Sequence, residues 1–206
     1  MEFEQFASKI TIQGLSKYHD QNGKRLHVID NLSLNIRKGE FLSIVGPSGC
    51  GKSTLLSIIA GLEKNFTGTV DMQEVPKGRV SFVFQSPRLL PWQNVRNNVK
   101  FSLEATKVFP KEKWDAKASE VLSIVGLSGF DRAFPNQLSG GMQTRVAIAR
   151  ALATEPEVLL MDEPFSSLDE ITARNLRREL LSIWEKTGTT IVFVTHDINE
   201  AVFMAD

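Results

Sequence analysis

Apolar and polar residues alternate along the first part of the chain, a pattern typical of strands with one buried face. Leu32, Leu34 and Ile36 are separated by polar residues, and Asn22-Gly23 is a tight-turn signal between two such stretches. From residue 41 onward the pattern changes. Short apolar runs at residues 41–45, 80–84, 158–161 and 190–195 are typical of buried strands. We therefore expect short strands at the N-terminal end and a parallel sheet after them.

Amphipathic stretches separate the apolar runs. Helical patterns cover residues 52–60, 141–153 and 170–186, with a last helical turn near residues 199–205. Residues 86–137 carry several prolines and indicate a mostly helical insertion, whose apolar stripe is Trp114, Ala118, Val121, Leu122 and Val125. Apolar strands that alternate with helices predict an α/β fold, a mainly parallel sheet covered on both faces.

Composition and charge limit the class of protein. The 206 residues suffice for one sizeable domain, and 24 Lys and Arg balance 24 Asp and Glu. A net charge of zero argues against a general nucleic-acid binder, so we expect no nucleic-acid partner. No apolar run approaches the roughly 18–20 residues of a membrane-spanning helix. The lone cysteine, Cys50, fits a reducing compartment, so we expect a soluble, cytoplasmic protein.

A glycine-rich loop stands between the strand predicted at residues 41–45 and the helix predicted at 52–60. It matches G-x-x-x-x-G-K-[ST], and this strand–loop–helix context is that of a phosphate-binding loop. Glycines let successive N–H groups point at phosphate oxygens, and the helix N-terminus adds partial positive charge. Lys52 would reach the β- and γ-phosphates, and Ser53 would ligate Mg²⁺. The predicted nucleotide-binding residues are Gly46, Pro47, Ser48, Gly49, Cys50, Gly51, Lys52, Ser53 and Thr54.

Two acidic residues, Asp162 and Glu163, directly follow the apolar run 158–161. The carboxyl end of a parallel strand faces the open crevice of an α/β sheet, where ligands bind. We expect Asp162 to hold Mg²⁺ through a water and Glu163 to accept a proton from an attacking water. The alternative is an N-cap role, for which Asp169 is the better candidate. The pair therefore indicates hydrolysis without a covalent intermediate.

The segment Leu138-Ser139-Gly140-Gly141-Met142-Gln143 resembles the signature sequence of ABC-transporter ATPases. With the phosphate loop and the acidic strand it forms a set that other P-loop enzymes do not share, and the resemblance covers essentially the whole chain. It implies a P-loop NTPase of ABC ATPase type with a single domain over residues 1–206. Residues 1–85 and 138–206 would form a RecA-like core with an N-terminal β part, and residues 86–137 a helical subdomain. Members of this family continue past the histidine that corresponds to His196, so we expect the C-terminal end of this chain to be truncated.

The same resemblance implies roles for single residues. Tyr18 looks like the aromatic residue that stacks on adenine, and Gln85 looks like the glutamine that senses Mg²⁺ and water. His196 resembles the switch histidine that contacts the γ-phosphate. The expected catalytic residues are thus Glu163, His196 and Gln85, and the expected metal-binding residues are Ser53, Gln85 and Asp162.

The signature also implies a dimer. Ser139, Gly140 and Gly141 open a predicted helix, whose N-terminus is a second anion site. The helical insertion would hold this site away from the phosphate loop of its own chain. The resemblance therefore implies two copies arranged head to tail with ATP and Mg²⁺ between them. ATP would contact Lys52 and Glu163 of one copy and the signature of the other.

Residues 89–92, 140–142 and 164–169 look like those of bacterial importer ATPases for nitrate, sulfonates, taurine and related small anions. This resemblance implies an ATP-hydrolysing subunit on the inner face of the cell membrane. Its partners would be membrane permease subunits and, indirectly, a periplasmic or lipid-anchored solute-binding protein. Leu89, Leu90 and Trp92 would lie near the permease-binding groove, and packing within the helical subdomain is the alternative.

Three other functions compete with this interpretation. The first is a non-transport ABC ATPase acting on nucleic acid or the ribosome, but the tandem domains or long coiled coil of such proteins are not found here. The second is a small-molecule kinase, which would have no use for residues 138–142. The third is a nucleotide-dependent scaffold without turnover, which the complete set of catalytic positions argues against.

Overall fold

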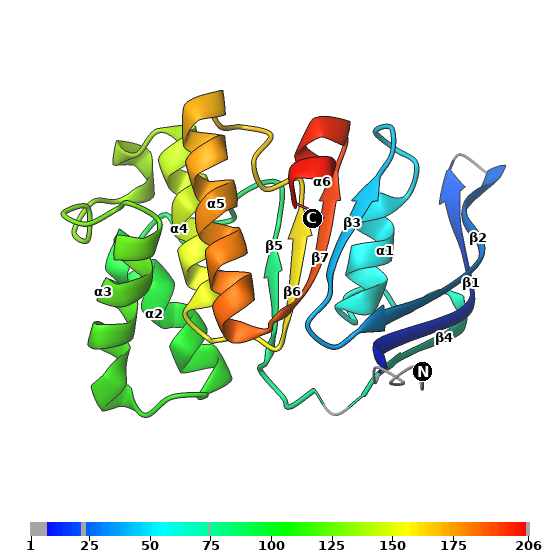
Figure 1. Ribbon diagram of the computed structural model, residues 1–206, viewed down its shortest axis with the longest axis horizontal. Coiled ribbons are helices and arrows are strands. Elements are labelled where there is room, and N and C mark those ends of the chain that lie inside the picture. Colours follow the sequence, from blue (N-terminus) through cyan, green and yellow to red (C-terminus); the bar gives the residue numbers. More distant parts are fainter. Residues whose placement is uncertain (1–7, 22–23, 74, 205–206) are drawn as a thin grey trace, which may run out of the picture.

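Two β-sheets form the framework of the part of the chain that the structure describes (Figure 1). The computed structural model describes residues 8–21, 24–73 and 75–204. The antiparallel sheet has the order β2-β1-β4, made of β1 (Ser8–Gln21), β2 (Lys24–Arg37) and β4 (Thr67–Met72). The parallel sheet has the order β3-β7-β6-β5, made of β3 (Phe41–Val45), β7 (Thr190–Thr195), β6 (Val158–Asp162) and β5 (Val80–Val83).

The antiparallel sheet differs from the expectation of short strands, because β1 and β2 each run for 14 residues. Strand β4 was not predicted, since its sequence TGTVDM is mostly polar and its side chains are only partly buried. It forms through pairing with β1, in which Ile12 lies opposite Val70. The predicted turn at Asn22-Gly23 lies outside the described residues, between the ends of β1 and β2.

The parallel sheet is buried on both faces, as its continuous apolar strands predicted. Along β6 the side chains alternate, so Val158 and Leu160 face one side and Leu159 and Met161 the other. The first side packs against α1 (Lys52–Ile59) and the antiparallel sheet. The second side packs against α4 (Gly140–Leu152) and α5 (Glu170–Thr187). The expected α/β architecture is confirmed.

A helical segment lies beyond the β5 edge of the parallel sheet (Figure 1). Ala118, Val121 and Leu122 form its buried stripe, as the periodicity predicted. Asn98 is fully buried, and its amide group bonds to Leu90 and Gln93, which ties the preceding loop to the first helix. The elements are α2 (Val95–Thr106), η1 (Lys111–Lys113), α3 (Trp114–Ile124) and η2 (Pro135–Gln137), and α6 (Ile198–Met204) follows β7.

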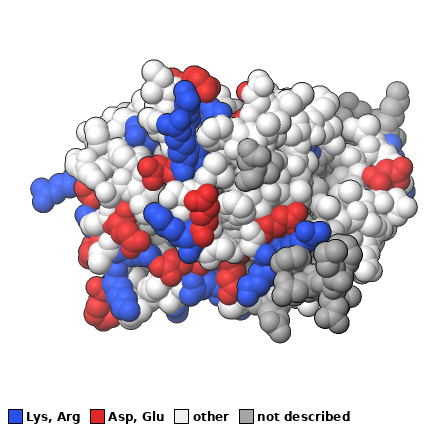
Figure 2. All heavy atoms as spheres, in the orientation of Figure 1, with Lys and Arg blue, Asp and Glu red and all other residues white. Residues whose placement is uncertain are grey.

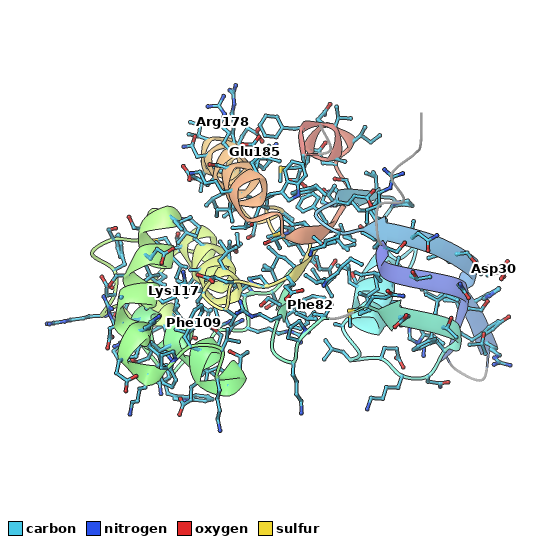
Figure 3. All side chains as sticks on the ribbon, turned by 60° about the horizontal axis from the view of Figure 1, so that its bottom comes forward. Asp30, Phe82, Phe109, Lys117, Arg178 and Glu185 are labelled. Carbon is cyan, nitrogen blue, oxygen red and sulfur yellow. The ribbon has the colours of Figure 1, made fainter. Side chains whose placement is uncertain are left out.

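The surface shows how charge is distributed. On the face shown in Figure 2, basic and acidic side chains are interspersed and form no broad basic area. In Figure 3, Lys117 lies beside Phe109 in the helical segment, with its Nζ 5.7 Å from the ring centroid. None of the helices within the described ranges has the length and apolar character to cross a membrane.

Candidate functional site

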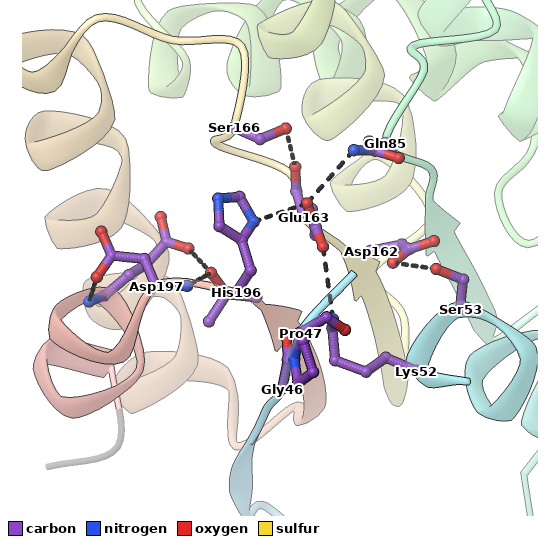
Figure 4. Close-up of polar contacts among 12 residues, drawn as sticks. Gly46, Pro47, Lys52, Ser53, Gln85, Asp162, Glu163, Ser166, His196 and Asp197 are labelled. Carbon is purple, nitrogen blue, oxygen red and sulfur yellow. Dashed lines mark hydrogen bonds and ion pairs between the residues drawn. The ribbon is translucent and has the colours of Figure 1, made fainter. Parts of the chain in front are cut away.

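Parallel pairing brings the predicted site residues to one edge of the sheet. Val45 of β3 lies opposite Thr195 of β7, and Asp162 of β6 lies opposite Val194. The segments that follow these strands therefore leave the sheet at the same edge. They carry the phosphate loop, Glu163 and His196 (Figure 4). Gln85, two residues beyond β5, reaches the same place.

The phosphate loop has a backbone that requires glycine. Gly51 is the N-cap of α1, with φ at +102°, and a Cβ there would lie 2.8 Å from the carbonyl oxygen of Val28. At Gly46 a Cβ would lie 2.9 Å from Sγ of Cys50. Both contacts are closer than real Cβ atoms allow. At Gly51 both the positive φ and the nearby backbone oxygen require glycine, whereas at Gly46 the neighbour is the end of the exposed Cys50 side chain.

The start of α1 is suited to an anion. No side chain caps it, and its first turn contains no acidic residue. Ser48, Gly49 and Cys50 of the loop are exposed, so the approach to the helix N-terminus is open to solvent. Unsatisfied N–H groups and the helix dipole attract phosphate at such a place.

Lys52 lies at the centre of the loop. Its side chain is buried, and Nζ donates hydrogen bonds to the carbonyl oxygens of Gly46 (2.7 Å) and Pro47 (2.9 Å). The same Nζ lies 3.7 Å from Oε1 of Glu163. The structure thus holds one ammonium group between the phosphate loop and the acidic strand end.

Glu163 connects all parts of the site. Its Oε2 accepts a hydrogen bond from Nε2 of Gln85 at 3.3 Å and lies 2.9 Å from Nδ1 of His196. Its backbone has φ at +44°, in the left-handed region that is unusual for a residue with a side chain. Its N–H donates to the carbonyl oxygen of Val194 at 2.9 Å. The structure therefore brings Lys52, Gln85, Glu163 and His196 together.

Ser53 and Asp162 form the second polar pair of the site. Oγ of Ser53 donates to Oδ1 of Asp162 at 2.9 Å. Burial raises the pKa of Asp162, with a further rise from the charge of Glu163, while the hydrogen bond from Ser53 and the charge of Lys52 oppose the shift. A hydroxyl and a carboxylate oxygen are hard donors of the kind that Mg²⁺ prefers, and a cation would relieve the buried negative charge. The pair fits the predicted metal site.

The signature residues lie at the start of α4. Ser139 is its N-cap and accepts a hydrogen bond from the N–H of Met142 at 3.2 Å, and the helix begins at Gly140 rather than Gly141. Helices α4 and α1 pack on opposite faces of the parallel sheet. The structure therefore does not bring Ser139, Gly140 and Gly141 to the phosphate loop of the same chain.

Tyr18 lies on β1, within the antiparallel sheet. Its ring is stacked on that of His27, its cross-strand partner, with centroids 4.2 Å apart, and Arg25 lies 4.3 Å from the ring centroid. Tyr18 as a whole residue is 37% exposed. His27 is exposed, and its stacking on Tyr18 depends on the strand register, so the sequence alone does not predict this contact.

A buried acid behind His196 was also missed. Glu200 of α6 is buried and accepts a hydrogen bond from Oγ1 of Thr195, the last residue of β7. Thr195 Oγ1 in turn accepts from the N–H of Asp197 at 3.1 Å. Burial raises the pKa of Glu200. These contacts hold the turn that carries His196.

Asp169 is the N-cap of α5, as predicted. Its side chain accepts a hydrogen bond from the N–H of Thr172.

The apolar residues after Gln85 divide into two groups. Leu89 packs against the core of the helical side, so for this residue the alternative of internal packing is correct. Leu90 is also partly buried, whereas Trp92 is 70% exposed. Gln93, the next residue, lines a groove of about 240 Å³. The lining residues are Gln93, Asn97, Lys100, Phe101, Glu104 and Trp114.

Comparisons with known proteins agree with this geometry. Residues 29–166 match the family model described as ABC transporter. The chain is 48% identical to an ABC transporter ATP-binding protein of Methanocaldococcus jannaschii, over 96% of this chain and 75% of that protein. It is 46% identical to the aliphatic sulfonates import ATP-binding protein of Bacillus subtilis, over 96% of this chain and 77% of that protein. A dimeric structure of the ATP-binding cassette MJ0796 bound to ADP and Pi matches with a TM-score of 0.87 and 37% identity, covering 94% of this chain and 90% of that one.

Proposed function

The chain belongs to the ABC transporter family, and on that premise we propose that it is the ATP-hydrolysing subunit of an importer for a small anion. A sulfonate is the favoured class of solute, because several relatives at 43–48% identity are aliphatic sulfonate import ATP-binding proteins. The observation that carries the proposal is the convergence of Lys52, Glu163 and His196 on one edge of the sheet. The non-transport alternative is not favoured by these relatives.

The chain is an ATP hydrolase. The N–H groups at the start of α1 and the ammonium group of Lys52 would bind the phosphates of ATP. Glu163 would take a proton from water as its oxygen attacks the γ-phosphorus and the bond to the ADP oxygen breaks. His196 would hold Oε2 of Glu163 toward the γ-phosphate. Gln85, which follows β5, would orient the attacking water.

We place the magnesium site at Ser53 and Asp162, with Gln85 as the third contributor from the end of β5. Mg²⁺ bound with ATP would neutralise phosphate charge and favour one orientation of the triphosphate. Within the described residues no group of three His, Cys, Asp or Glu could hold a metal on its own. A cation at Ser53 and Asp162 would therefore need phosphate oxygens as further ligands.

Two copies of the chain would form the working unit. Because the parallel sheet separates α4 from α1, the N-terminus of α4 would complete the nucleotide site of a second copy. Ser139 and Gly141 of one copy would face the γ-phosphate held by Lys52 of the other. The dimeric structure of the related cassette supports this arrangement. Tyr18 would stack on the adenine ring of ATP.

The helical segment, residues 86–137, would act as the subdomain that receives the membrane permease. Exposed Trp92 and the neighbouring groove would contact the cytoplasmic side of the permease. The chain would thus be peripheral on the inner face of the membrane, and a solute-binding protein would deliver the anion to the permease from outside. The import function named for the relatives supports the permease as a partner.

Uptake in intact cells tests the proposal. The gene is deleted, and uptake of radiolabelled ethanesulfonate, taurine and nitrate is measured before and after complementation. Complementation with the wild-type chain or Glu185→Gln, an exposed substitution on α5, is expected to restore sulfonate uptake (Figure 3). Complementation with Lys52→Ala is expected to fail, because the ammonium group at the phosphate loop is lost.

The outcomes separate the parts of the proposal. Loss of sulfonate uptake alone supports the favoured solute class, and loss of nitrate uptake alone would keep the importer but replace its solute. Uptake of all three anions that is unchanged by the deletion would contradict the importer function. Purified chain that hydrolyses MgATP no faster than its Lys52→Ala variant would contradict the assigned phosphate site.

A further inference from the structure

The ring of Tyr18 carries two partners from the neighbouring strand β2. The imidazole of His27 is parallel to it within 6°, with the ring centroids 4.2 Å apart. Cζ of Arg25 lies over the same ring, 4.3 Å from its centroid. A parallel imidazole at this distance leaves no space for a guanidinium group on the same face of the ring. The two groups therefore cover opposite faces.

Strand pairing explains this arrangement. His27 lies directly opposite Tyr18, and Arg25, two residues away on β2, projects from the same face of the strand. Arg25 is thus a diagonal neighbour of Tyr18, at a distance that a long side chain can span. The three side chains form one stack on the surface of the antiparallel sheet.

The stack lies close to the phosphate loop. Val28 follows His27 on β2, and its carbonyl oxygen would lie 2.8 Å from a Cβ at Gly51, the N-cap of α1. The strand segment that contacts the loop therefore begins one residue from the stack. A base attached to phosphates at the loop would reach Tyr18, but it could stack on the ring only after one of the two groups leaves.

Arg25 is held more weakly than His27. It is exposed, and among the described residues it has its contact with the ring and no hydrogen bond or ion pair. His27 is the direct cross-strand partner of Tyr18, and its Nε2 also lies 3.5 Å from Oδ1 of Asp30. A cation–π contact at an exposed site changes an equilibrium only about 2- to 5-fold. A base therefore displaces Arg25 at the lower cost.

We infer that Arg25 covers the base-binding face of Tyr18 and competes with adenine for it, so that this arginine sets how much the base contributes to nucleotide affinity. The inference rests on the proposed function, which places ATP at the phosphate loop and its base on Tyr18. Competition of this kind lowers the apparent affinity by the fraction of molecules in which the face is covered. It acts on the base alone and leaves the binding of the phosphates unchanged.

The test separates the contribution of the base from that of the phosphates. The dissociation constants of ATP and of inorganic triphosphate are measured by calorimetry without Mg²⁺, and their ratio, triphosphate over ATP, gives the base contribution. Loss of a cation weakens the binding of both polyanions, so this electrostatic effect cancels in the ratio. Arg25→Ala should raise the ratio roughly 2- to 5-fold.

Three further variants show whether the effect passes through the ring. Lys38→Ala removes an exposed cation just beyond the other end of β2 and should leave the ratio unchanged. Tyr18→Leu should lower the ratio, and adding Arg25→Ala to Tyr18→Leu should change it no further, because the shared ring is gone. His27→Ala should raise the ratio less than Arg25→Ala does.

The outcomes distinguish the inference from the proposed function. If ATP binds and Arg25→Ala leaves the ratio unchanged, or raises it equally in the Tyr18→Leu background, the competition is wrong and the proposed function stands. A larger rise in His27→Ala than in Arg25→Ala would show that the base takes the other face, which also overturns the inference. If the wild-type chain binds ATP no more tightly than inorganic triphosphate and does not hydrolyse MgATP, the proposed function fails and the inference fails with it.

Discussion

Replacing Glu163 with glutamine tests the centre of the proposed site. The substitution keeps the length of the side chain and removes the charge that faces Nδ1 of His196 at 2.9 Å and Nζ of Lys52 at 3.7 Å. Loss of a general base lowers the rate of the chemical step roughly 100- to 10,000-fold. We expect a fall in kcat within that range.

The expected change in ATP affinity has the opposite sign. Two unit charges about 4 Å apart attract by about 4 kcal/mol at an effective dielectric constant near 20, before desolvation is counted. In Glu163→Gln this attraction no longer holds Lys52 toward the strand end, and the carboxylate no longer repels the γ-phosphate. ATP should therefore bind as tightly as in the wild-type chain or more tightly. The variant should accumulate as an ATP-bound dimer.

The assay combines steady-state hydrolysis with light scattering after size-exclusion chromatography, with and without MgATP. Glu185→Gln on the exposed surface of α5 is the charge-matched control and should behave as the wild-type chain (Figure 3). A kcat within about threefold of the wild-type value would refute the role of Glu163 as base. Loss of ATP binding in Glu163→Gln would refute the electrostatic argument.

Three further predictions concern other parts of the molecule. His196→Ala should lower kcat roughly 100-fold with little change in ATP affinity, and a normal steady-state rate would show that the histidine has no catalytic part. Trp92→Ala should weaken permease binding by about 2 kcal/mol, roughly 30-fold, while Leu62→Ala, at another exposed apolar site, should leave co-purification of the permease unchanged. Loss of ATP affinity in Trp92→Ala would contradict the surface role. Burial raises the pKa of Glu200, so the folded state holds its proton more tightly than the unfolded state and loses stability as pH rises above the ordinary glutamate pKa. Glu200→Gln should therefore flatten the decline in melting temperature as pH rises above the ordinary glutamate pKa, and parallel wild-type and variant curves would exclude this titration.

Local signals were sufficient to predict the framework of the site. The apolar run before the phosphate loop and the run before Asp162 each specify a buried strand, and parallel strands place their carboxyl ends at one edge. Lys52, Asp162 and Glu163 therefore had to lie near one another once the strand order was right. The observed bonds of Ser53 to Asp162 and of Glu163 to His196 agree with that expectation.

Contacts that depend on register or on packing between layers could not be read from the sequence. The stack of Tyr18 on His27 requires the pairing of β1 with β2, which the turn signal alone does not determine. The hydrogen bond between Thr144 and Ser167 joins α4 to the loop before α5. Neither a threonine nor a serine at these positions predicts such a contact from the sequence. Glu200 is polar in a short terminal helix, and only the packing of α6 shows that it is buried.

The backbone of Glu163 explains why the acidic strand can serve the phosphate loop at all. Along an extended strand the side chain of residue 163 would point to the same face as Met161, which packs among the helices on the side away from α1. Instead the φ of +44° turns the chain after Asp162, while the N–H of Glu163 still donates to Val194. Such a conformation costs on the order of 1–3 kcal/mol. Asp162 already faces α1 through the alternation along β6 and meets Ser53 there. The turn brings the carboxylate of Glu163 to the same side, where it meets Lys52, so the strain is located at the residue whose position the reaction depends on most.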